Sequence, residues 1–244
     1  MEKANAKTLF ISDVHLGAKA SSAESLLHLL KTVRPEKVVL VGDIIDGWKL
    51  KRGVFYWDEW HTKVLRKILG FGKEIPIVYV TGNHDDFLRS ISPFTFGNIT
   101  ICDEYVHELA DGRKMLVCHG DVFDGLEPIS PWLYSLGDRA YDLCLYLNQK
   151  FNWLRHKFGF GYWSLSSYLK QQVKTATNHV QNFEACLIRH AKHKDCVGVI
   201  CGHIHKPAMK TFDDGFVYVN TGDWVESCSA IIETEEGLKS WCSK

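Results

Sequence analysis

The stretch VYVTGNHD, residues 78–85, places an amide, an imidazole and a carboxylate directly after an apolar run rich in β-branched residues. An apolar run of this kind is typical of a strand that is buried on both faces. Polar side chains at the end of a buried strand cost free energy unless they are paired. The stretch therefore predicts either a cluster of mutually satisfied side chains or a site for a ligand.

The same arrangement recurs along the chain and indicates an α/β fold. Five short apolar runs end in polar residues, at 8–12, 37–41, 75–81, 114–118 and 196–201. Two helical patterns separate the first three runs. One begins with the capping-box spacing of Ser21 and Glu24, and the other covers residues 57–69 before Gly70 and Gly72. Strands that alternate with helices predict parallel pairing through crossover connections.

The C-terminal part of the chain has a different pattern. Short strand-like segments lie at residues 209–212, 216–220, 229–234 and 238–242. The first pair is joined by Asp-Asp-Gly and the second pair by Glu-Glu-Gly, which are typical of hairpin turns. This pattern predicts a second, mostly antiparallel sheet.

Composition indicates a globular protein of ordinary charge. The chain has 244 residues, with 29 basic and 29 acidic side chains, so no charge excess indicates a nucleic-acid partner and none is expected. No apolar run approaches the ~18 residues that span a bilayer. The N-terminal residues lack a signal-peptide core, so a cytoplasmic location is expected. The eight cysteines are scattered and are expected to be reduced.

Five polar clusters follow the five apolar runs. They are Asp13 and His15 in SDVH, Asp43 and Asp46 in GDIID, Asn83, His84 and Asp85 in GNHD, His119 and Asp121 in CHGD, and His203 and His205 in GHIH. The carboxyl ends of strands in an open α/β sheet face a common crevice, so these clusters are expected to meet. Each cluster alone is more simply explained as a capped turn or a hydrogen-bonded histidine, but their joint occurrence favours a ligand site.

The residue types indicate a pair of metal ions. Imidazole, carboxylate and amide ligands suit borderline divalent ions, with manganese expected and iron or zinc as alternatives. The clusters offer seven candidate ligands: Asp13, His15, Asp43, Asn83, His119, His203 and His205. Seven protein ligands are too many for one ion and suit two ions that share a carboxylate. Two ions about 3.5–4 Å apart are a known arrangement for hydrolysing phosphate esters.

The ordered set of motifs resembles that of the calcineurin-like metallophosphoesterases, over residues 8–125 and 196–242. The resemblance implies a four-layer α-β-β-α sandwich with a helical lid insertion. It also implies two metal sites that share Asp43. The first would be formed by Asp13, His15, Asp43 and His205, and the second by Asp43, Asn83, His119 and His203. His84 and Asp85 would be catalytic, with Asp85 orienting His84, and Asn83 and His84 would also contact the substrate.

In its length, in Trp48 after the GDIID motif and in the helical insertion between CHGD and GHIH, the chain resembles the UDP-2,3-diacylglucosamine pyrophosphatases of lipid A synthesis. This resemblance implies release of UMP and 2,3-diacylglucosamine 1-phosphate. The expected substrate is therefore a nucleotide-linked glycolipid. One departure is His84, because the best-known branch of that group has an arginine in its place. The alternative is a general phosphodiesterase that acts on cyclic or small nucleotides. A non-enzymatic scaffold is disfavoured because no motif residue is missing.

The segment between the motifs is expected to be a separate helical lid at residues 126–195, inserted into a core of residues 1–125 and 196–244. Its aromatic residues exceed what one buried helix face requires. The surplus favours two interpretations equally: a homodimer contact, or a lid that holds acyl chains and touches the inner membrane surface. Ser167, Lys170 and Lys174 are candidate substrate contacts there, with a solvated helix face as the simpler alternative.

Overall fold

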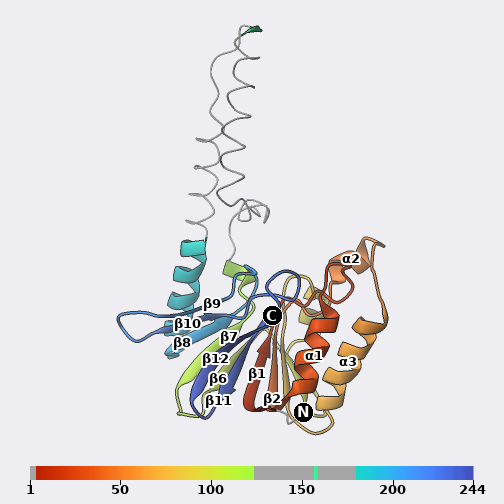
Figure 1. Ribbon diagram of the computed structural model, residues 1–244. Helices are drawn as coiled ribbons and strands as arrows, with labels where there is room; N and C mark the ends of the chain where they lie inside the picture. The colour runs from red at the N-terminus through yellow and green to blue at the C-terminus, as the bar shows by residue number, and fades with distance from the viewer. Residues whose placement is uncertain (1–3, 124–156, 159–179, 244) are drawn as a thin grey trace. The chain divides into compact units, whose positions relative to one another are not determined.

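The computed structural model describes residues 4–123, 157–158 and 180–243, in which the strands form two sheets (Figure 1). The seven-stranded sheet has the order β12 (Gly237–Cys242), β11 (Ser229–Thr234), β1 (Ala4–Ile11), β2 (Val33–Val41), β3 (Ile77–Val80), β5 (Ile99–Cys102) and β4 (Phe94–Phe96). The five-stranded sheet has the order β6 (Glu104–Glu108), β7 (Lys114–Cys118), β8 (Gly198–Cys201), β10 (Val217–Asn220) and β9 (Ala208–Thr211).

The core lies on both faces of the seven-stranded sheet because successive side chains of a strand point to opposite faces. Phe10 belongs to the apolar cluster that also contains Met115 and Ile200 of the five-stranded sheet. Its neighbour Leu9 belongs to a second cluster that contains Leu26 of the covering helix. All five of these side chains are fully buried. The near-continuous apolar runs of the sequence are explained by this burial on two faces.

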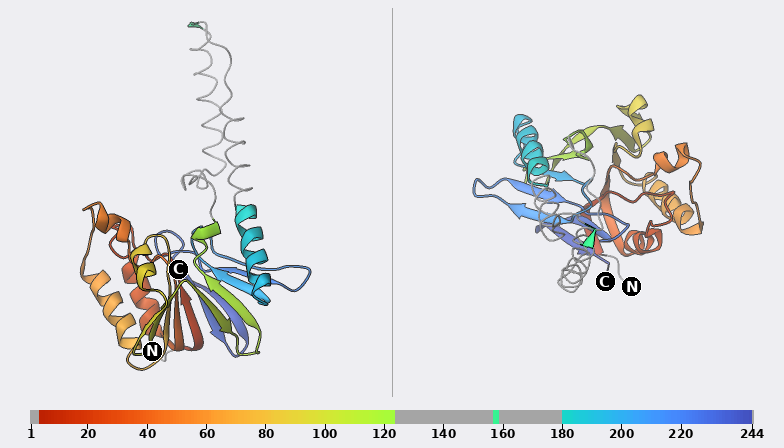
Figure 2. Two further views of the ribbon diagram at one scale, coloured as in Figure 1. Left: turned by 180° about the vertical axis from the view of Figure 1, so that it is seen from behind. Right: turned by 90° about the horizontal axis from the view of Figure 1, so that it is seen from above.

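Two helices cover the outer face of the seven-stranded sheet, α1 (Ala23–Thr32) and α3 (Glu59–Phe71), as Figures 1 and 2 show. The carboxylate of Asp58 begins α3 by accepting hydrogen bonds from the Trp60 and His61 backbone amides. The capping box predicted at Ser21 is wrong. The Ser21 hydroxyl instead donates to the Val14 carbonyl at 2.6 Å, and α1 begins one residue later.

Helical residues 186–193 cover the outer face of the five-stranded sheet (Figure 2). Among them, the Leu187 and Ala191 side chains are fully buried. The His190 imidazole contacts the Glu104 carboxylate of β6 at 2.6 Å. The α-β-β-α order of layers expected from the sequence is confirmed.

Contacts divide the chain into one unit of Met1–Phe123 with Cys186–Lys244 and a second unit of Asp124–Ala185. The lid boundaries at 126 and 195 stay a prediction. Ser167, Lys170 and Lys174 lie outside the described residues. Within the described parts of the chain, no helix is both long and apolar enough to cross a bilayer.

The predicted antiparallel sheet at the C-terminus is wrong, because its four strands are divided between the two sheets. The two hairpins form as predicted, with β9 antiparallel to β10 and β11 antiparallel to β12. However, β10 pairs in parallel with β8, whereas β11 pairs antiparallel with β1. A hairpin turn determines only which strands are neighbours, and pairing with distant strands determines the sheet.

The strand register brings the carboxyl ends of the central strands level. Ile11 of β1 pairs with Leu40 of β2, and Val41 of β2 pairs with Val80 of β3. In the other sheet, β7 and β8 are also parallel. The polar clusters that follow these strands therefore lie at one end of both sheets, which places them within reach of one another.

Candidate metal centre

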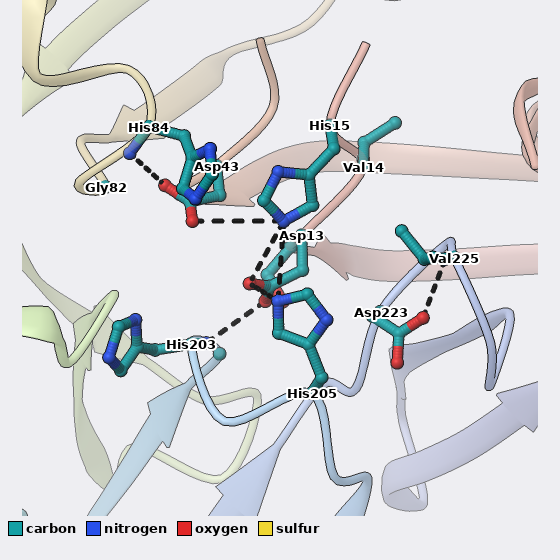
Figure 3. Close-up of polar contacts among 12 residues, drawn as sticks. Asp13, Val14, His15, Asp43, Gly82, His84, His203, His205, Asp223 and Val225 are labelled. Carbon is teal, nitrogen blue, oxygen red and sulfur yellow. Dashed lines mark hydrogen bonds and ion pairs between the residues drawn. The ribbon is translucent and has the colours of Figure 1, made fainter. Parts of the chain in front are cut away.

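Backbone hydrogen bonds hold the motif loops together at this end of the sheets, and the side chains that these loops carry lie close to one another in Figure 3. The amide of His15 donates to the Asp43 carbonyl at 2.9 Å, and the amide of Asp13 donates to the Gly42 carbonyl at 3.1 Å. The Gly202 amide donates to the His119 carbonyl at 3.1 Å and links two loops of the five-stranded sheet. The side chains of these loops are thus positioned by the backbone before any ligand binds.

A first group of ligand atoms comes from Asp13, His15 and His205, as the sequence predicts. His205 Nε2 lies 3.2 Å from Asp13 Oδ1 and 3.4 Å from His15 Nε2. His15 Nε2 lies 4.0 Å from Asp13 Oδ1. All three atoms lie within 4.8 Å of one another, the spacing expected of groups that share one ion.

A second group comes from Asp43, His119 and His203. His119 Nε2 lies 3.2 Å from Asp43 Oδ2. The other ring nitrogen of His119 contacts the Val41 carbonyl at 2.8 Å, so that Nδ1 is the donor to this carbonyl. This contact orients Nε2 toward the Asp43 carboxylate, an arrangement typical of metal-binding histidines.

Asp43 connects the two groups through a single oxygen. Its Oδ2 lies 3.2 Å from His119 Nε2 in the second group and 3.9 Å from His15 Nε2 in the first. Its Oδ1 accepts a hydrogen bond from the His84 amide at 2.8 Å. Asp43 therefore has the position required of a carboxylate that bridges two ions.

Unpaired buried atoms show that the donor set fits metal ions. Asp13 Oδ1, Asn83 Oδ1 and His119 Nε2 are buried and make no hydrogen bond of ordinary geometry to the described residues, although Asp13 Oδ1 and His119 Nε2 each lie 3.2 Å from a charged neighbour, His205 and Asp43. A buried polar atom without a partner costs free energy, so such atoms indicate a missing ligand. Oxygen and imidazole nitrogen are ligands of borderline divalent ions, so this donor set fits the pair of ions that the sequence predicts.

The electrostatics of the site favour positive charge. Burial lowers the pKa of His119, but the Asp43 carboxylate outweighs burial and raises this pKa to about 10. Burial likewise lowers the pKa of His205, and Asp13 raises it to about 9. Burial dominates at His15 and lowers its pKa to about 4. The buried carboxylates thus stabilise a cation held between them and the imidazoles.

The backbone is strained at the residues that carry these ligand atoms. Left-handed φ angles of 49° to 69° occur at Asp13, His15, Asp43, His203 and His205. Each such angle in a residue other than glycine costs of order 1–3 kcal/mol. Strain of this kind is concentrated at functional sites, where it places a side chain that a relaxed backbone would direct elsewhere.

Two glycines allow the loops to approach closely. A Cβ atom on Gly42, whose φ is +83°, would lie 2.4 Å from His119 Nδ1. A Cβ atom on Gly82 would lie 2.2 Å from Asp43 Oδ1. Both distances are far below van der Waals contact, so any side chain at these positions would displace a candidate metal ligand.

The His84 ring lies between the Trp48 ring and His15 of the first group of ligand atoms. It stacks on Trp48 at 4.1 Å between centroids and meets the His15 ring edge-on at 4.5 Å. Its Nδ1 lies 3.1 Å from Asp46 Oδ1. The His84 side chain remains 22% exposed, whereas the side chains of His15 and Asp43 are almost fully buried. His84 is therefore accessible to a bound substrate.

The expected contact between Asp85 and His84 is not what the structure shows, since Asp46 is the carboxylate beside the His84 ring. Asp85 is fully buried and accepts hydrogen bonds from the Gly82 amide at 2.6 Å, the Ile44 amide at 2.9 Å and the Tyr79 hydroxyl at 2.6 Å. Asp85 thus ties the GDIID and GNHD loops together.

These motifs and their geometry agree with a family comparison. The family model of the calcineurin-like phosphoesterases matches residues 6–207 of the chain. The chain belongs to this family. Membership of the calcineurin-like phosphoesterases implies two divalent metal ions, and the two groups of ligand atoms that Asp43 connects are candidate sites for them.

Relatives within the calcineurin-like phosphoesterases carry a consistent name. A UDP-2,3-diacylglucosamine hydrolase of Shewanella sp. (strain ANA-3) is 23% identical over 95% of both chains. A protein of the same name from Neisseria meningitidis is 25% identical over 93% of both chains. Among solved structures, the phosphoesterase Yfce from E. coli has a TM-score of 0.47 at 14% identity, over 95% of this chain and 90% of that chain.

Three residues that support the site, Asp46, Asp121 and Asn220, have no role predicted from the sequence. Asp46 is the last residue of the GDIID motif, but its contact with His84 depends on the turn into α2 (Gly47–Lys51). Asp121 of the CHGD motif accepts two hydrogen bonds from Arg89, at 2.8 and 2.9 Å. Asn220 donates to the Gly202 carbonyl at 2.7 Å and supports the GHIH loop. No local sequence signal indicates the last two contacts.

The different surroundings of Asp46 and Asp85 allow a test of which carboxylate is the partner of His84. Asp46→Asn is expected to lower turnover of a phosphodiester by about 10-fold to 100-fold while the protein stays folded, because His84 loses its charged partner. Asp85→Asn is expected to lower the free energy of unfolding by about 1–3 kcal/mol, because an amide cannot accept from three buried donors equally well. Steady-state kinetics and thermal unfolding of both variants measure the two effects. The opposite pattern would restore Asp85 as the partner of His84.

Proposed function

We propose that this calcineurin-like phosphoesterase hydrolyses the diphosphate of UDP-2,3-diacylglucosamine to give UMP and 2,3-diacylglucosamine 1-phosphate. The observation that carries the proposal is the match to relatives named UDP-2,3-diacylglucosamine hydrolase over 95% of both chains. The metal-ligand geometry supports hydrolysis of a phosphorus ester. A nucleotide-linked glycolipid is therefore the proposed substrate class.

The proposed ligand sets follow the two groups of donor atoms. Asp13, His15, Asp43 and His205 would hold one ion, and Asp43, Asn83, His119 and His203 would hold the other. Manganese is the proposed ion, with iron or zinc as the alternatives, because nitrogen and oxygen ligands are mixed. Two bound ions would polarise the phosphoryl oxygens and lower the pKa of water at the site.

The exposed histidine is proposed to act on the substrate. Because His84 Nδ1 faces the Asp46 carboxylate and donates to it, Nε2 is the ring atom left for the substrate, and as an imidazolium the ring donates from Nε2 to a phosphoryl or leaving-group oxygen. The Trp48 ring on one side and His15 on the other restrict the His84 ring to this orientation. Asn83 precedes His84 in the chain, and its buried Oδ1, which has no hydrogen-bond partner among the described residues, is proposed to contact the substrate as well. Ser167, Lys170 and Lys174 stay proposed substrate contacts of the insertion.

The test compares hydrolysis of four substrates by the manganese-loaded protein: UDP-2,3-diacylglucosamine, UDP-glucosamine without acyl chains, cyclic AMP and a chromogenic phosphodiester. The acylated substrate is expected to have a kcat/KM at least about 100-fold above that of UDP-glucosamine, because each buried CH₂ group contributes about 0.8 kcal/mol. Release of UMP identifies the diphosphate as the cleaved bond.

A control and an opposing outcome make this test decisive. Asp43→Asn is the matched inactive control, which excludes a contaminating hydrolase. Equal kcat/KM values for the acylated and the unacylated UDP sugar would contradict the lipid substrate. A preference for cyclic AMP would support the alternative, a general phosphodiesterase of small nucleotides.

A further inference from the structure

The segment of residues 47–57, GWKLKRGVFYW, has a composition unlike the rest of the site. It contains three basic residues and no acidic residue, and five of its eleven residues are Trp, Tyr, Phe or Leu. Phe55 packs over Gly17, but most of the other apolar side chains of the segment are exposed. Leu50 is 57% exposed and Val54 is 63% exposed, and Trp48, Tyr56 and Trp57 are also exposed.

This surface borders the candidate metal centre. Trp48 stacks on His84, and the Asp46 carboxylate accepts from the Lys49 amide where α2 begins. Figure 1 shows α2 at the end of the seven-stranded sheet from which the motif loops emerge. The surface continues onto the 3₁₀ turn η1 (Asp86–Ile91), because the exposed Phe87 ring lies against Gly47.

We call these side chains the basic–aromatic patch. Its members are Trp48, Lys49, Leu50, Lys51, Arg52, Val54, Tyr56, Trp57 and Phe87.

The charge of the basic–aromatic patch is not cancelled by the acidic residues beside it. Asp58 accepts from the amides of Trp60 and His61 at the start of α3. Glu59 pairs with Lys63 of the same helix at 2.7 Å. Of the three basic residues, Lys51 pairs with Asp86 at 2.9 Å. Lys49 and Arg52 thus leave a net positive charge among the exposed aromatic side chains.

We infer that the basic–aromatic patch docks this protein on a bilayer that contains anionic lipids. Aromatic rings interleaved with basic residues are typical of segments that lie in the headgroup region of a membrane. Each basic residue near an anionic surface adds to the attraction, which falls off within about one Debye length. A lipid surface satisfies both chemistries of the patch, because it offers negative headgroups above an apolar layer.

The inference concerns binding alone and does not depend on the proposed substrate. It gives the exposed apolar residues a role that a site for a small polar nucleotide would not need. It also places His84 next to the membrane contact, since Trp48 belongs to the basic–aromatic patch and stacks on the His84 ring. A substrate held in the bilayer would therefore lie within reach of the metal centre.

The test measures flotation of the full-length protein with vesicles of phosphatidylcholine, with and without 30 mol% phosphatidylglycerol. The protein is expected to float with the anionic vesicles and to be released as salt is raised from about 0.1 to 1 M, where the screening length falls from about 10 to 3 Å. Leu50→Ser with Val54→Ser is expected to lower the partition coefficient by about tenfold. Lys49→Gln with Arg52→Gln is expected to lower it by about tenfold on anionic vesicles only.

A matched control removes the same kind of exposed side chain elsewhere. Leu69 is 47% exposed on α3 and Val197 is 41% exposed before β8, so Leu69→Ser with Val197→Ser should bind vesicles as the unchanged protein does. Hydrolysis of a chromogenic phosphodiester in solution shows that each variant is folded. Equal flotation of the Leu50 and Val54 variant and the unchanged protein would overturn the inference.

Two other occupants of the basic–aromatic patch give distinguishable results, and both contradict docking on a bilayer. If a second copy of the chain covers the patch, the unchanged protein stays in solution with vesicles and the Leu50 and Val54 variant sediments as a smaller species. If residues 124–179 of the same chain cover it, the unchanged protein again stays in solution and the variant unfolds at a lower temperature.

Discussion

Asp43→Asn is expected to remove both metal ions and to lower turnover of any phosphodiester by at least about 10³-fold. The reason is the position of one oxygen, Oδ2, which lies 3.2 Å from His119 and 3.9 Å from His15. The amide that replaces the carboxylate is neutral and can turn its NH₂ group toward two imidazoles. Each ion would then lose a charged ligand. The two positive ions would also repel each other more strongly, because no anion would lie between them.

Metal analysis of the purified variant, together with its rate, measures this effect. The matched control is Asp121→Asn, which removes a carboxylate that pairs with Arg89 and belongs to neither group of ligand atoms. The control is expected to keep two ions per chain. Two fully bound ions and a near-normal rate in Asp43→Asn would exclude Asp43 as the bridging ligand.

His84→Ala is expected to keep both ions and to lose about 10²–10⁴-fold in turnover, the range for a positioned acid or electrostatic donor. The His84 ring is held between Trp48 and His15, beside Asp46, and keeps 22% of its side chain exposed. Its backbone amide still donates to Asp43 in the variant, because the substitution changes only the side chain. The loops that hold the ions should therefore be unaffected.

Here the informative comparison is between metal content and rate. His28→Ala serves as the control, since His28 is an exposed histidine of α1. It is expected to change neither quantity. If His84→Ala loses an ion along with its activity, then His84 is a ligand and its assignment to the substrate is wrong.

The gathering of the candidate ligand residues at the candidate metal centre could be predicted from sequence, because each of them follows a strand whose apolar composition indicates burial. The strands at residues 114–118 and 229–234 have the bounds that the pattern predicts. Parallel pairing then brings Asp13, Asp43 and His119 to one end of the sheets without further information. Side chains fixed mainly by strand order are thus accessible to sequence reasoning.

Contacts that depend on a turn could not be predicted in this way. Asp46 and Asp85 each end a motif that begins with glycine, GDIID and GNHD, and the backbone path decides which of the two carboxylates faces His84. The same limit applies to β4, β5 and β6, whose three to five residues are partly exposed and lack a continuous apolar run. Their place in the sheets follows from long-range pairing.

The left-handed backbone at five candidate ligand residues ties the supply of metal to the amount of folded enzyme. Strain of order 1–3 kcal/mol at each residue adds up to a large share of the 5–15 kcal/mol that stabilises a typical domain. Ions that bind only the folded chain offset this strain in proportion to the logarithm of their concentration. A cell deprived of the ions would then lose the protein to proteolysis as well as its catalysis. The amount of the enzyme in the cell would then fall as divalent metal ions become scarce.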